Sequence, residues 1–212
     1  MNMTTKTTAH LSSDQQTAIR AAVNKAESHT SGEIVPLLVA KSDDYREAAA
    51  QAAAVIASAL ALALALIIHD TLVWFFLPTV FVLYFPTLAA VHRLPLLKLA
   101  FTPAARVNEV VHRQAMHIFF EKGLHRTRDE NGILIFISLL ERKVWILGDR
   151  GINAVIPPER WISLASTLSA GIRQGRLTEA LVGVIAEMGD VLRQHFPSRQ
   201  DDVNELPDLL GE

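Results

Sequence analysis

Residues 48–68 read AAAQAAAVIASALALALALII, and residues 71–91 read TLVWFFLPTVFVLYFPTLAAV. Neither run contains Asp, Glu, Lys or Arg. Each run is about 21 residues long, and a helix that rises about 1.5 Å per residue then spans the roughly 30 Å of a hydrocarbon core. Only His69 and Asp70 separate the runs, so the second helix must run back antiparallel to the first. The two runs therefore predict a transmembrane helical hairpin in an integral membrane protein.

The alternative is a buried helical hairpin in a water-soluble protein. Such a hairpin would need a large surrounding core, because the two runs carry no polar stripe of helical period and are apolar on every side. A chain of 212 residues that spends 44 of them on the hairpin region leaves too little sequence for that core. We therefore favour insertion into lipid.

Charged residues beside the hairpin predict its orientation. The flanking basic residues are Lys41, Arg46, Arg93, Lys98 and Arg106, whereas the turn carries only Asp70 as a charged residue. Because positive residues favour the cytoplasmic side, both flanks and both termini are predicted to be cytoplasmic. The first residues contain no apolar stretch typical of a secretory signal. The basic residues Arg93, Lys98, Arg106 and Arg113 are expected to contact anionic lipid headgroups.

Composition excludes several classes of function. The chain is 50% hydrophobic, and 20 basic residues face 22 acidic ones, so it is neither typical of a disordered protein nor positive enough to attract nucleic acid. The absence of cysteine excludes disulfides, thiolate metal sites and a cysteine nucleophile. The sequence also lacks a Walker A motif, a dinucleotide fingerprint, a zinc-protease motif and a nucleophile elbow. No catalytic residue can therefore be assigned, and we expect no nucleic-acid partner.

The sequence on either side of the hairpin predicts an α/β fold. Ser12 and Gln15 have the spacing of a capping box before a helix that ends near Ser28. A buried strand is expected at residues 33–40, at the edge of a sheet because of Pro36. The later elements are a helix from Pro103 to about Gly123, antiparallel strands at 132–138 and 142–148, and helices at 158–172 and 177–196. We expect a small mixed sheet sandwiched by helices, with the two-helix hairpin inserted after the first strand.

This order predicts four segments along the chain. Residues 1–47 form the first part of the α/β domain, residues 48–91 form the transmembrane hairpin, and residues 92–196 form the second part of the domain. Residues 197–212 are expected to be a polar C-terminal tail.

Four acidic residues are expected to gather at one edge of the sheet if its first two strands are parallel. Glu33 begins the first strand, Asp129 and Glu130 precede the second, and Asp149 follows the third. Carboxylate oxygens are the ligands that Ca²⁺ and Mg²⁺ prefer, so these four residues are candidate metal ligands. The alternative is that they are ordinary turn and cap residues, with Asp149 pairing with Arg128 or Arg150.

Four pieces of sequence carry a resemblance to a known family. They are Ser31-Gly32-Glu33-Ile34, residues 129–135 (DENGILI), residues 141–152 (ERKVWILGDRGI) and residues 204–208 (NELPD). Their order and spacing resemble the TPM domain family, in its bacterial branch with a membrane hairpin. The resemblance implies an α/β/α sandwich and a location in the bacterial inner membrane.

The resemblance implies two kinds of function. Some members, including a thylakoid lumen protein linked to photosystem repair, are described as acid phosphatases or calcium binders, whereas others are accessory or assembly factors of membrane complexes. Soluble members tend to carry Gly-x-Gly-Leu-Glu, but this chain has Asn153 at the acidic position, which weakens the phosphatase interpretation. We therefore expect an accessory or interaction factor that contacts the bilayer and a membrane-protein complex or a second copy of itself. A metal-dependent phosphatase that uses Ca²⁺ or Mg²⁺ is the alternative.

Overall fold

The computed structural model describes residues 11–68 and 73–198. The chain divides into two compact units, one made of Met1–Ser42 with Val110–Glu212 and the other of Asp43–Glu109. The predicted turn at His69 and Asp70 and the end of the predicted tail lie outside the described residues. The two units are described separately below.

The first unit contains a mixed sheet of three strands. These are β1 (Glu33–Val39), β2 (Gly132–Ser138) and β3 (Lys143–Gly148), in the order β1-β2-β3. Strands β1 and β2 are parallel, with Glu33 opposite Gly132, and β2 and β3 are antiparallel, with Ile133 opposite Gly148. Both pairings confirm the expected sheet, and Pro36 lies in an edge strand as predicted.

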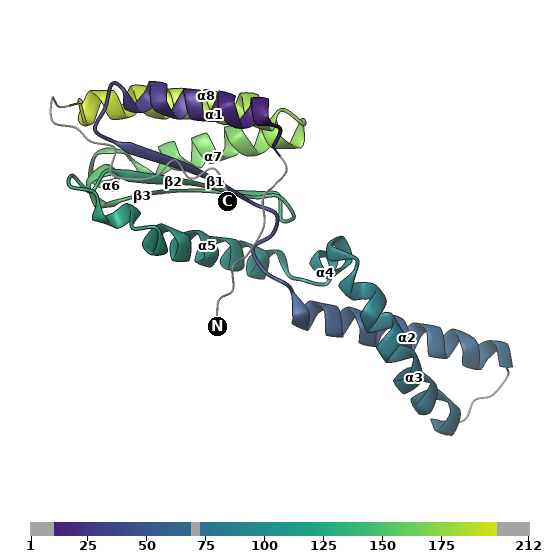
Figure 1. Cartoon of the computed structure of the whole chain (residues 1–212). Coiled ribbons are helices and arrows are strands. Elements are labelled where there is room, and N and C mark those ends of the chain that lie inside the picture. Colours follow the sequence, from purple (N-terminus) through teal and green to yellow (C-terminus); the bar gives the residue numbers. More distant parts are fainter. Residues whose placement is uncertain (1–10, 69–72, 199–212) are drawn as a thin grey trace. The chain divides into compact units, whose positions relative to one another are not determined.

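Helices cover both faces of this sheet (Figure 1). One face packs against α1 (Ser13–Glu27), α7 (Pro158–Arg173) and α8 (Leu177–His195), and the other faces α5 (Ala104–Glu121) from Val110 onward. Side chains alternate accordingly, because successive residues of a strand point to opposite faces. Ile133, Ile135 and Ile137 join the core beneath α1, α7 and α8, with Ile34 and Leu38 from β1. The α/β class predicted from the sequence is confirmed.

Local signals explain where several elements begin. Ser12 caps α1: its Oγ accepts from the Gln15 amide at 3.2 Å while the Gln15 side chain accepts from the Ser12 amide at 3.0 Å, as the capping box predicts. Two short elements of this unit were not predicted, the 3₁₀ turn at Leu124–Arg126 and the helix α6 at Arg150–Val155. Both lie beside the predicted acidic edge.

The second unit is built on two long helices, α2 (Arg46–Ile68) and α3 (Val73–His92), followed by the short α4 (Pro95–Ala100). Helices α2 and α3 pack against each other along a stripe of alanines that are fully buried. The stripe consists of Ala49, Ala52, Ala53, Ala57 and Ala61. Small side chains at this spacing let two helices approach closely, as they do in membranes. Pro78 and Pro86 lie inside α3.

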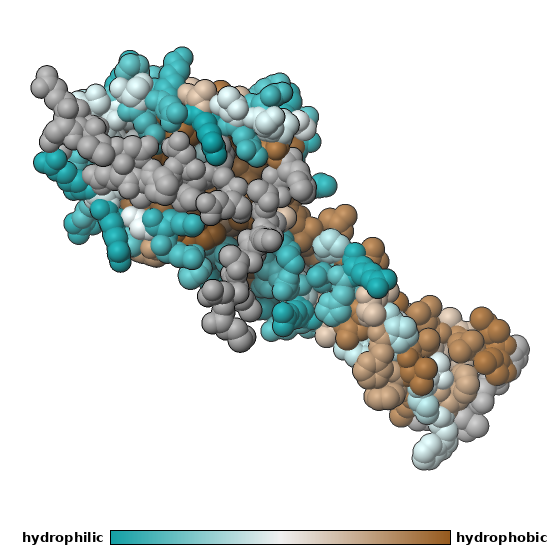
Figure 2. All heavy atoms as spheres, in the orientation of Figure 1, coloured by the Kyte–Doolittle hydropathy of each residue, from teal (hydrophilic) through white to brown (hydrophobic). Residues whose placement is uncertain are grey.

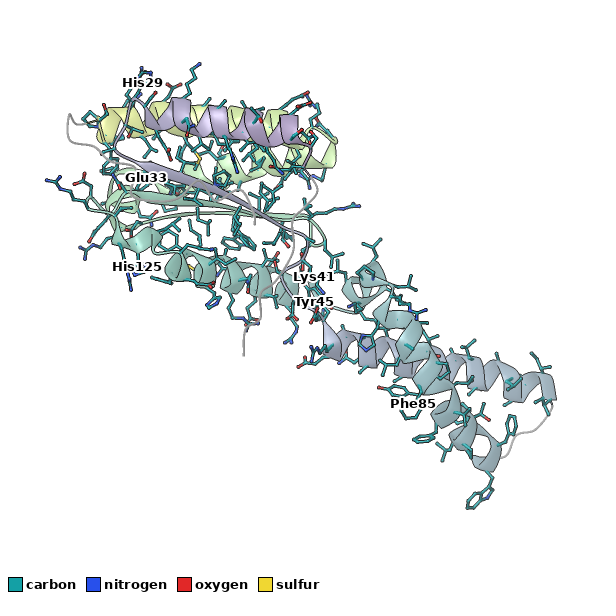
Figure 3. All side chains as sticks on the ribbon, viewed as in Figure 1. His29, Glu33, Lys41, Tyr45, Phe85 and His125 are labelled. Atoms are coloured by element: carbon teal, nitrogen blue, oxygen red, sulfur yellow. The ribbon has the colours of Figure 1, made fainter. Side chains whose placement is uncertain are left out.

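Large apolar side chains point outward from α2 and α3, and Figure 2 shows that brown, hydrophobic residues make up much of the visible surface of these helices. The most exposed are Leu66, Ile67, Trp74, Phe81 and Val82, each with at least two thirds of its surface accessible. Phe85 likewise projects from α3 (Figure 3). Both helices are long and apolar enough to cross a membrane. Their apolar surface is outside, which is the reverse of a water-soluble core.

Two of the basic residues that were expected at lipid headgroups are engaged within this unit. Lys98 is buried, and its Nζ donates to the Asp44 carbonyl oxygen at 2.9 Å. Arg106 pairs with Glu47 at 2.8 Å. Both contacts hold the start of α2 against the segment that follows α3. Lys98 thus has a structural contact that its position in the sequence did not predict.

Candidate functional site

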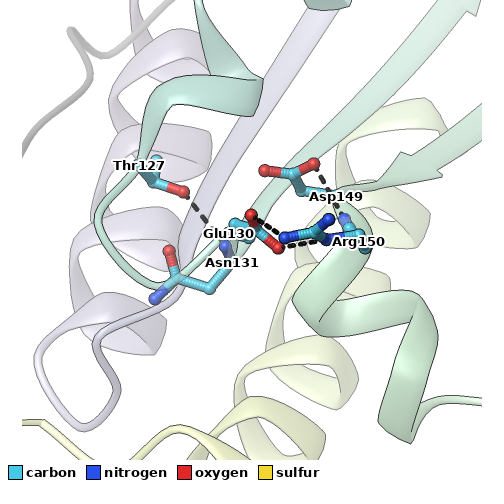
Figure 4. Close-up of polar contacts among 5 residues, drawn as sticks. All are labelled: Thr127, Glu130, Asn131, Asp149 and Arg150. Atoms are coloured by element: carbon cyan, nitrogen blue, oxygen red, sulfur yellow. Dashed lines mark hydrogen bonds and ion pairs between the residues drawn. The ribbon is translucent and has the colours of Figure 1, made fainter.

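The predicted acidic residues lie at one end of the sheet, where β1 and β2 begin and β3 ends. Backbone contacts fix this end: the Asp149 amide donates to the Gly132 carbonyl at 2.9 Å, and the Glu33 amide to the Asn131 carbonyl at 3.3 Å. Asn131 is itself held in place, because its backbone amide donates to the Thr127 hydroxyl at 3.0 Å (Figure 4). Strand pairing therefore places Glu33, Glu130 and Asp149 at the same edge, as the parallel arrangement predicts.

Glu130 forms a two-pronged ion pair with Arg150 (Figure 4). The guanidinium donates from Nε at 2.7 Å and from Nη2 at 2.6 Å, one bond to each carboxylate oxygen. The hydrogen bond to Glu130, and then the charge of the same carboxylate, raise the pKa of the Arg150 guanidinium above its ordinary value. Both oxygens of Glu130 are thereby engaged. The sequence left Arg128 and Arg150 as alternative partners of Asp149, and the Arg150 side chain bonds to Glu130 instead.

Asp149 caps α6. Its Oδ1 accepts from the Arg150 amide at 2.8 Å, which is the usual role of an aspartate before a helix. Its Oδ2 is buried and has no hydrogen-bond partner in the described part of the chain. A buried acceptor without a donor is costly, so this oxygen calls for a partner, such as a water molecule or a donor group of a ligand.

Gly151 allows the start of α6 to approach this edge. Its amide donates to the Glu130 carbonyl at 3.0 Å. A Cβ atom at this position would lie 2.6 Å from the Asp129 carbonyl oxygen and 2.9 Å from that of Glu130. Any larger residue would push α6 away from the loop, so glycine is required for the arrangement of Glu130, Asp149 and Arg150.

Asn153 occupies the position at which the soluble TPM members tend to carry an acid. Its Nδ2 donates to the Gly148 carbonyl at 2.5 Å, and its Oδ1 accepts from Trp161 Nε1 at 3.1 Å. Asn153 therefore ties α6 to the end of β3 and to α7. A carboxylate could not make the first of these bonds, because it has no proton to donate.

Each of the four predicted ligands has other interactions in this arrangement. Glu130 is held by Arg150, Asp149 has one uncommitted oxygen, and Glu33 and Asp129 have interactions of their own. Within residues 11–68 and 73–198, no group of three or more His, Cys, Asp or Glu side chains could hold a metal ion. A Ca²⁺ or Mg²⁺ site at these residues stays a prediction.

A pocket of about 650 Å³ opens beside Asp149. Met116, Phe119 and Phe120 of α5 form one wall, and the end of β3 with Asp149 and Asn153 forms the other. The Phe120 ring also contacts the His125 ring at a tilt of 59°, with 5.1 Å between the ring centroids. This pocket could not be predicted from the sequence, because the apolar residues of α5 read as ordinary core positions.

A second polar cluster lies at the opposite end of β1 and β2. Ser138 donates to Glu141 Oε2, Ser42 Oγ contacts Ser138 Oγ at 2.9 Å, and the Ser42 amide donates to Glu141 Oε1 at 2.9 Å. Ser138 and Glu141 are buried. This cluster was not predicted, because Ser42 lies 96 positions from Ser138 and 99 positions from Glu141 along the chain. Its contacts join the exit of β1 to the turn between β2 and β3.

These features define a class of protein: an α/β/α sandwich whose polar edge and pocket lie where β3 meets α6. A family model of the TPM domain matches residues 100–191. This match supports the TPM family assignment that the resemblance in the sequence suggested. No curated protein matches the chain.

Among solved structures, the chain is similar to the NMR structure of the BA42 protein from the psychrophilic bacterium Bizionia argentinensis. The two share 22% sequence identity over 95% of each chain, with a TM-score of 0.59. This similarity supports the fold.

Proposed function

We propose that this protein is an integral protein of the bacterial inner membrane, anchored by α2 and α3, with its TPM domain and both termini in the cytoplasm. The observation that carries the proposal is the outward apolar surface of these two helices. Leu66, Ile67 and Trp74 would each expose more than two thirds of their surface to water in a soluble protein. Lipid removes this cost, while the alanine stripe supplies the close packing between the helices.

We further propose that the TPM domain acts as an accessory or interaction factor, which docks onto a membrane-protein complex or a second copy of the chain. The hydrogen bonds and ion pair at the polar edge support an accessory role over a catalytic one. Glu130 is paired with Arg150, Asn153 donates to a carbonyl oxygen, and Asp149, the acid that lines the pocket, already caps α6 through one of its oxygens. A nucleophile beside an acid–base pair, which is one common arrangement for hydrolysis, is not assembled around the pocket in the described residues.

Extraction of membranes tests the anchoring. The full chain, expressed with a terminal tag, should stay in the membrane pellet after washing at alkaline pH or with high salt, and only detergent should release it. Release by the alkaline wash would show a peripheral protein and contradict the anchor.

A size measurement and an assay test the role. After mild detergent extraction, the chain should migrate in a complex larger than its 23.3 kDa monomer. The purified chain should hydrolyse generic phosphate esters no faster than its Asp149→Asn variant, with or without Ca²⁺ or Mg²⁺. A metal-dependent activity that this substitution abolishes would support the alternative, a metal-dependent phosphatase, and overturn the accessory role.

A further inference from the structure

We infer that the pocket between α5 and α6 binds an organic cation, a Lys or Arg side chain presented by the partner protein. The inference deepens the proposed function and rests on it in one respect, because the cation is assigned to a docking partner. Three properties of the pocket carry it: an uncommitted carboxylate oxygen, an exposed aromatic ring and an apolar wall of suitable size.

The negative charge comes from Asp149. Its Oδ1 is occupied by the Arg150 amide at 2.8 Å, and its Oδ2 is buried without a partner. The neighbouring guanidinium makes no hydrogen bond to this carboxylate, because both of its bonds, at 2.7 and 2.6 Å, go to Glu130. An ammonium or guanidinium donor would satisfy Oδ2 with a charge-assisted hydrogen bond.

The wall opposite Asp149 suits the rest of a basic side chain. Met116, Phe119 and Phe120 line it, and Phe120 keeps 53% of its surface exposed. The face of an aromatic ring attracts a cation, while apolar side chains cover the aliphatic stem of lysine or arginine. The volume of about 650 Å³ lies within the range of pockets that hold small ligands.

Other ligands fit these walls less well. Ca²⁺ and Mg²⁺ require six or more oxygen ligands, whereas the pocket offers one uncommitted carboxylate oxygen and a largely apolar surface. A phosphate or a carboxylate would be repelled by Asp149, and the guanidinium that could hold it is already paired with Glu130.

Titration of the full chain in detergent tests the inference. The probes are N-acetyl-lysine methylamide and N-acetyl-arginine methylamide, and N-acetyl-norleucine methylamide is the uncharged control. We expect saturable binding of both basic probes, measured by calorimetry or by shifts in the ¹H–¹⁵N spectrum at residues around the pocket. Norleucine should bind at least about tenfold more weakly, since it lacks the charge-assisted hydrogen bond.

Matched variants locate the binding. Asp149→Asn keeps a cap for α6, because asparagine serves as well as aspartate at this position, but it removes the charge and should weaken lysine binding about tenfold or more. Phe120→Leu keeps an apolar wall without the ring and should weaken binding a few fold. Glu179→Gln, which removes an exposed acid of α8 away from the pocket, should leave binding unchanged.

Three results would overturn the inference: equal binding of lysine and norleucine, unchanged binding to Asp149→Asn, or displacement of the probe by millimolar Ca²⁺. A free diamine that binds much more tightly than the capped lysine would assign the pocket to a small molecule and contradict a protein partner. Retention of the same variants in alkaline-washed membranes separates the two proposals. If the probes fail to bind while the chain stays in the membrane, only the pocket inference falls.

Discussion

The side-chain nitrogen of Asn153 lies 2.5 Å from the carbonyl oxygen of Gly148 and donates a hydrogen bond to it. The same amide accepts from Trp161 Nε1, so one residue links β3, α6 and α7. The resemblance in the sequence implies glutamate at this position in soluble members of the family. In this chain Asn153 holds α6, which forms part of the pocket wall, against β3 and α7, and it contributes no carboxylate.

The first prediction concerns this link. Asn153→Asp should destabilise the fold by about 1 kcal/mol, because aspartate cannot donate to Gly148 and its charge faces a carbonyl oxygen. Trp161→Phe should cost a similar amount, and the double variant should cost less than the sum, since the two residues share a bond. Denaturant unfolding in detergent measures these differences. Full additivity would show that the two side chains do not interact.

The elements with strong periodic signals could be predicted from the sequence. The sequence predicts strand β2 at its observed bounds, residues 132–138, because its apolar run is rich in isoleucine and lies between glycine and serine. Helices α7 and α8 were expected to within one residue at each end, because each has a clear apolar stripe. The parallel pairing of β1 and β2 followed from the long connection between them.

The candidate site was predictable only in part. The shared edge of Glu33, Glu130 and Asp149 followed from the sheet, but helix α6 did not, because six residues that include Gly151 and Asn153 are a weak helical signal. Asp149 before a short apolar pattern is the cap signal that could have revealed it. The pairing of Arg150 with Glu130, and the pocket against α5, depend on how the elements pack together, which no local pattern encodes.

The second prediction tests the close approach at the start of β2. A Cβ atom on Gly132 would lie 2.4 Å from the Leu124 carbonyl oxygen, so Gly132→Ala should destabilise the protein by more than about 2 kcal/mol. Gly183→Ala is the matched control, because the space around Gly183 is open and alanine favours a helix by up to about 1 kcal/mol. The midpoint of denaturant unfolding should fall for the first variant and hold or rise for the second. Equal midpoints would contradict the packing of Leu124 on β2.

The third prediction concerns the buried cluster at the other end of the sheet. Glu141→Gln turns one acceptor into a donor that faces the Ser138 hydroxyl or the Ser42 amide. We expect a loss of about 1 to 3 kcal/mol in the free energy of unfolding, because a buried polar group loses its partner. Ser42→Ala removes only the contact between the two hydroxyls and should cost less. A smaller loss for Glu141→Gln than for Ser42→Ala would refute this ranking.

The fourth prediction separates the two faces of α2. Ala53 is buried against α3, whereas Ala54 is exposed. Ala53→Leu should weaken the packing of the hairpin by about 1 to 3 kcal/mol, because the alanine stripe leaves no room for a larger side chain. Ala54→Leu adds the same atoms on the outer face and should be tolerated. Loss of helical circular dichroism as SDS is added reports the difference, and equal sensitivity would argue against the close contact.

The central claim is that α2 and α3 cross the inner membrane as a hairpin, with both flanks in the cytoplasm. The chain has no cysteine, so a single introduced thiol reports its own location. In cells with a permeable outer membrane and an intact inner membrane, a membrane-impermeant maleimide should label Asp70→Cys. It should label Ser13→Cys and Ser198→Cys only after the inner membrane is opened. Labelling of all three thiols, or of none, before that step would contradict the hairpin topology.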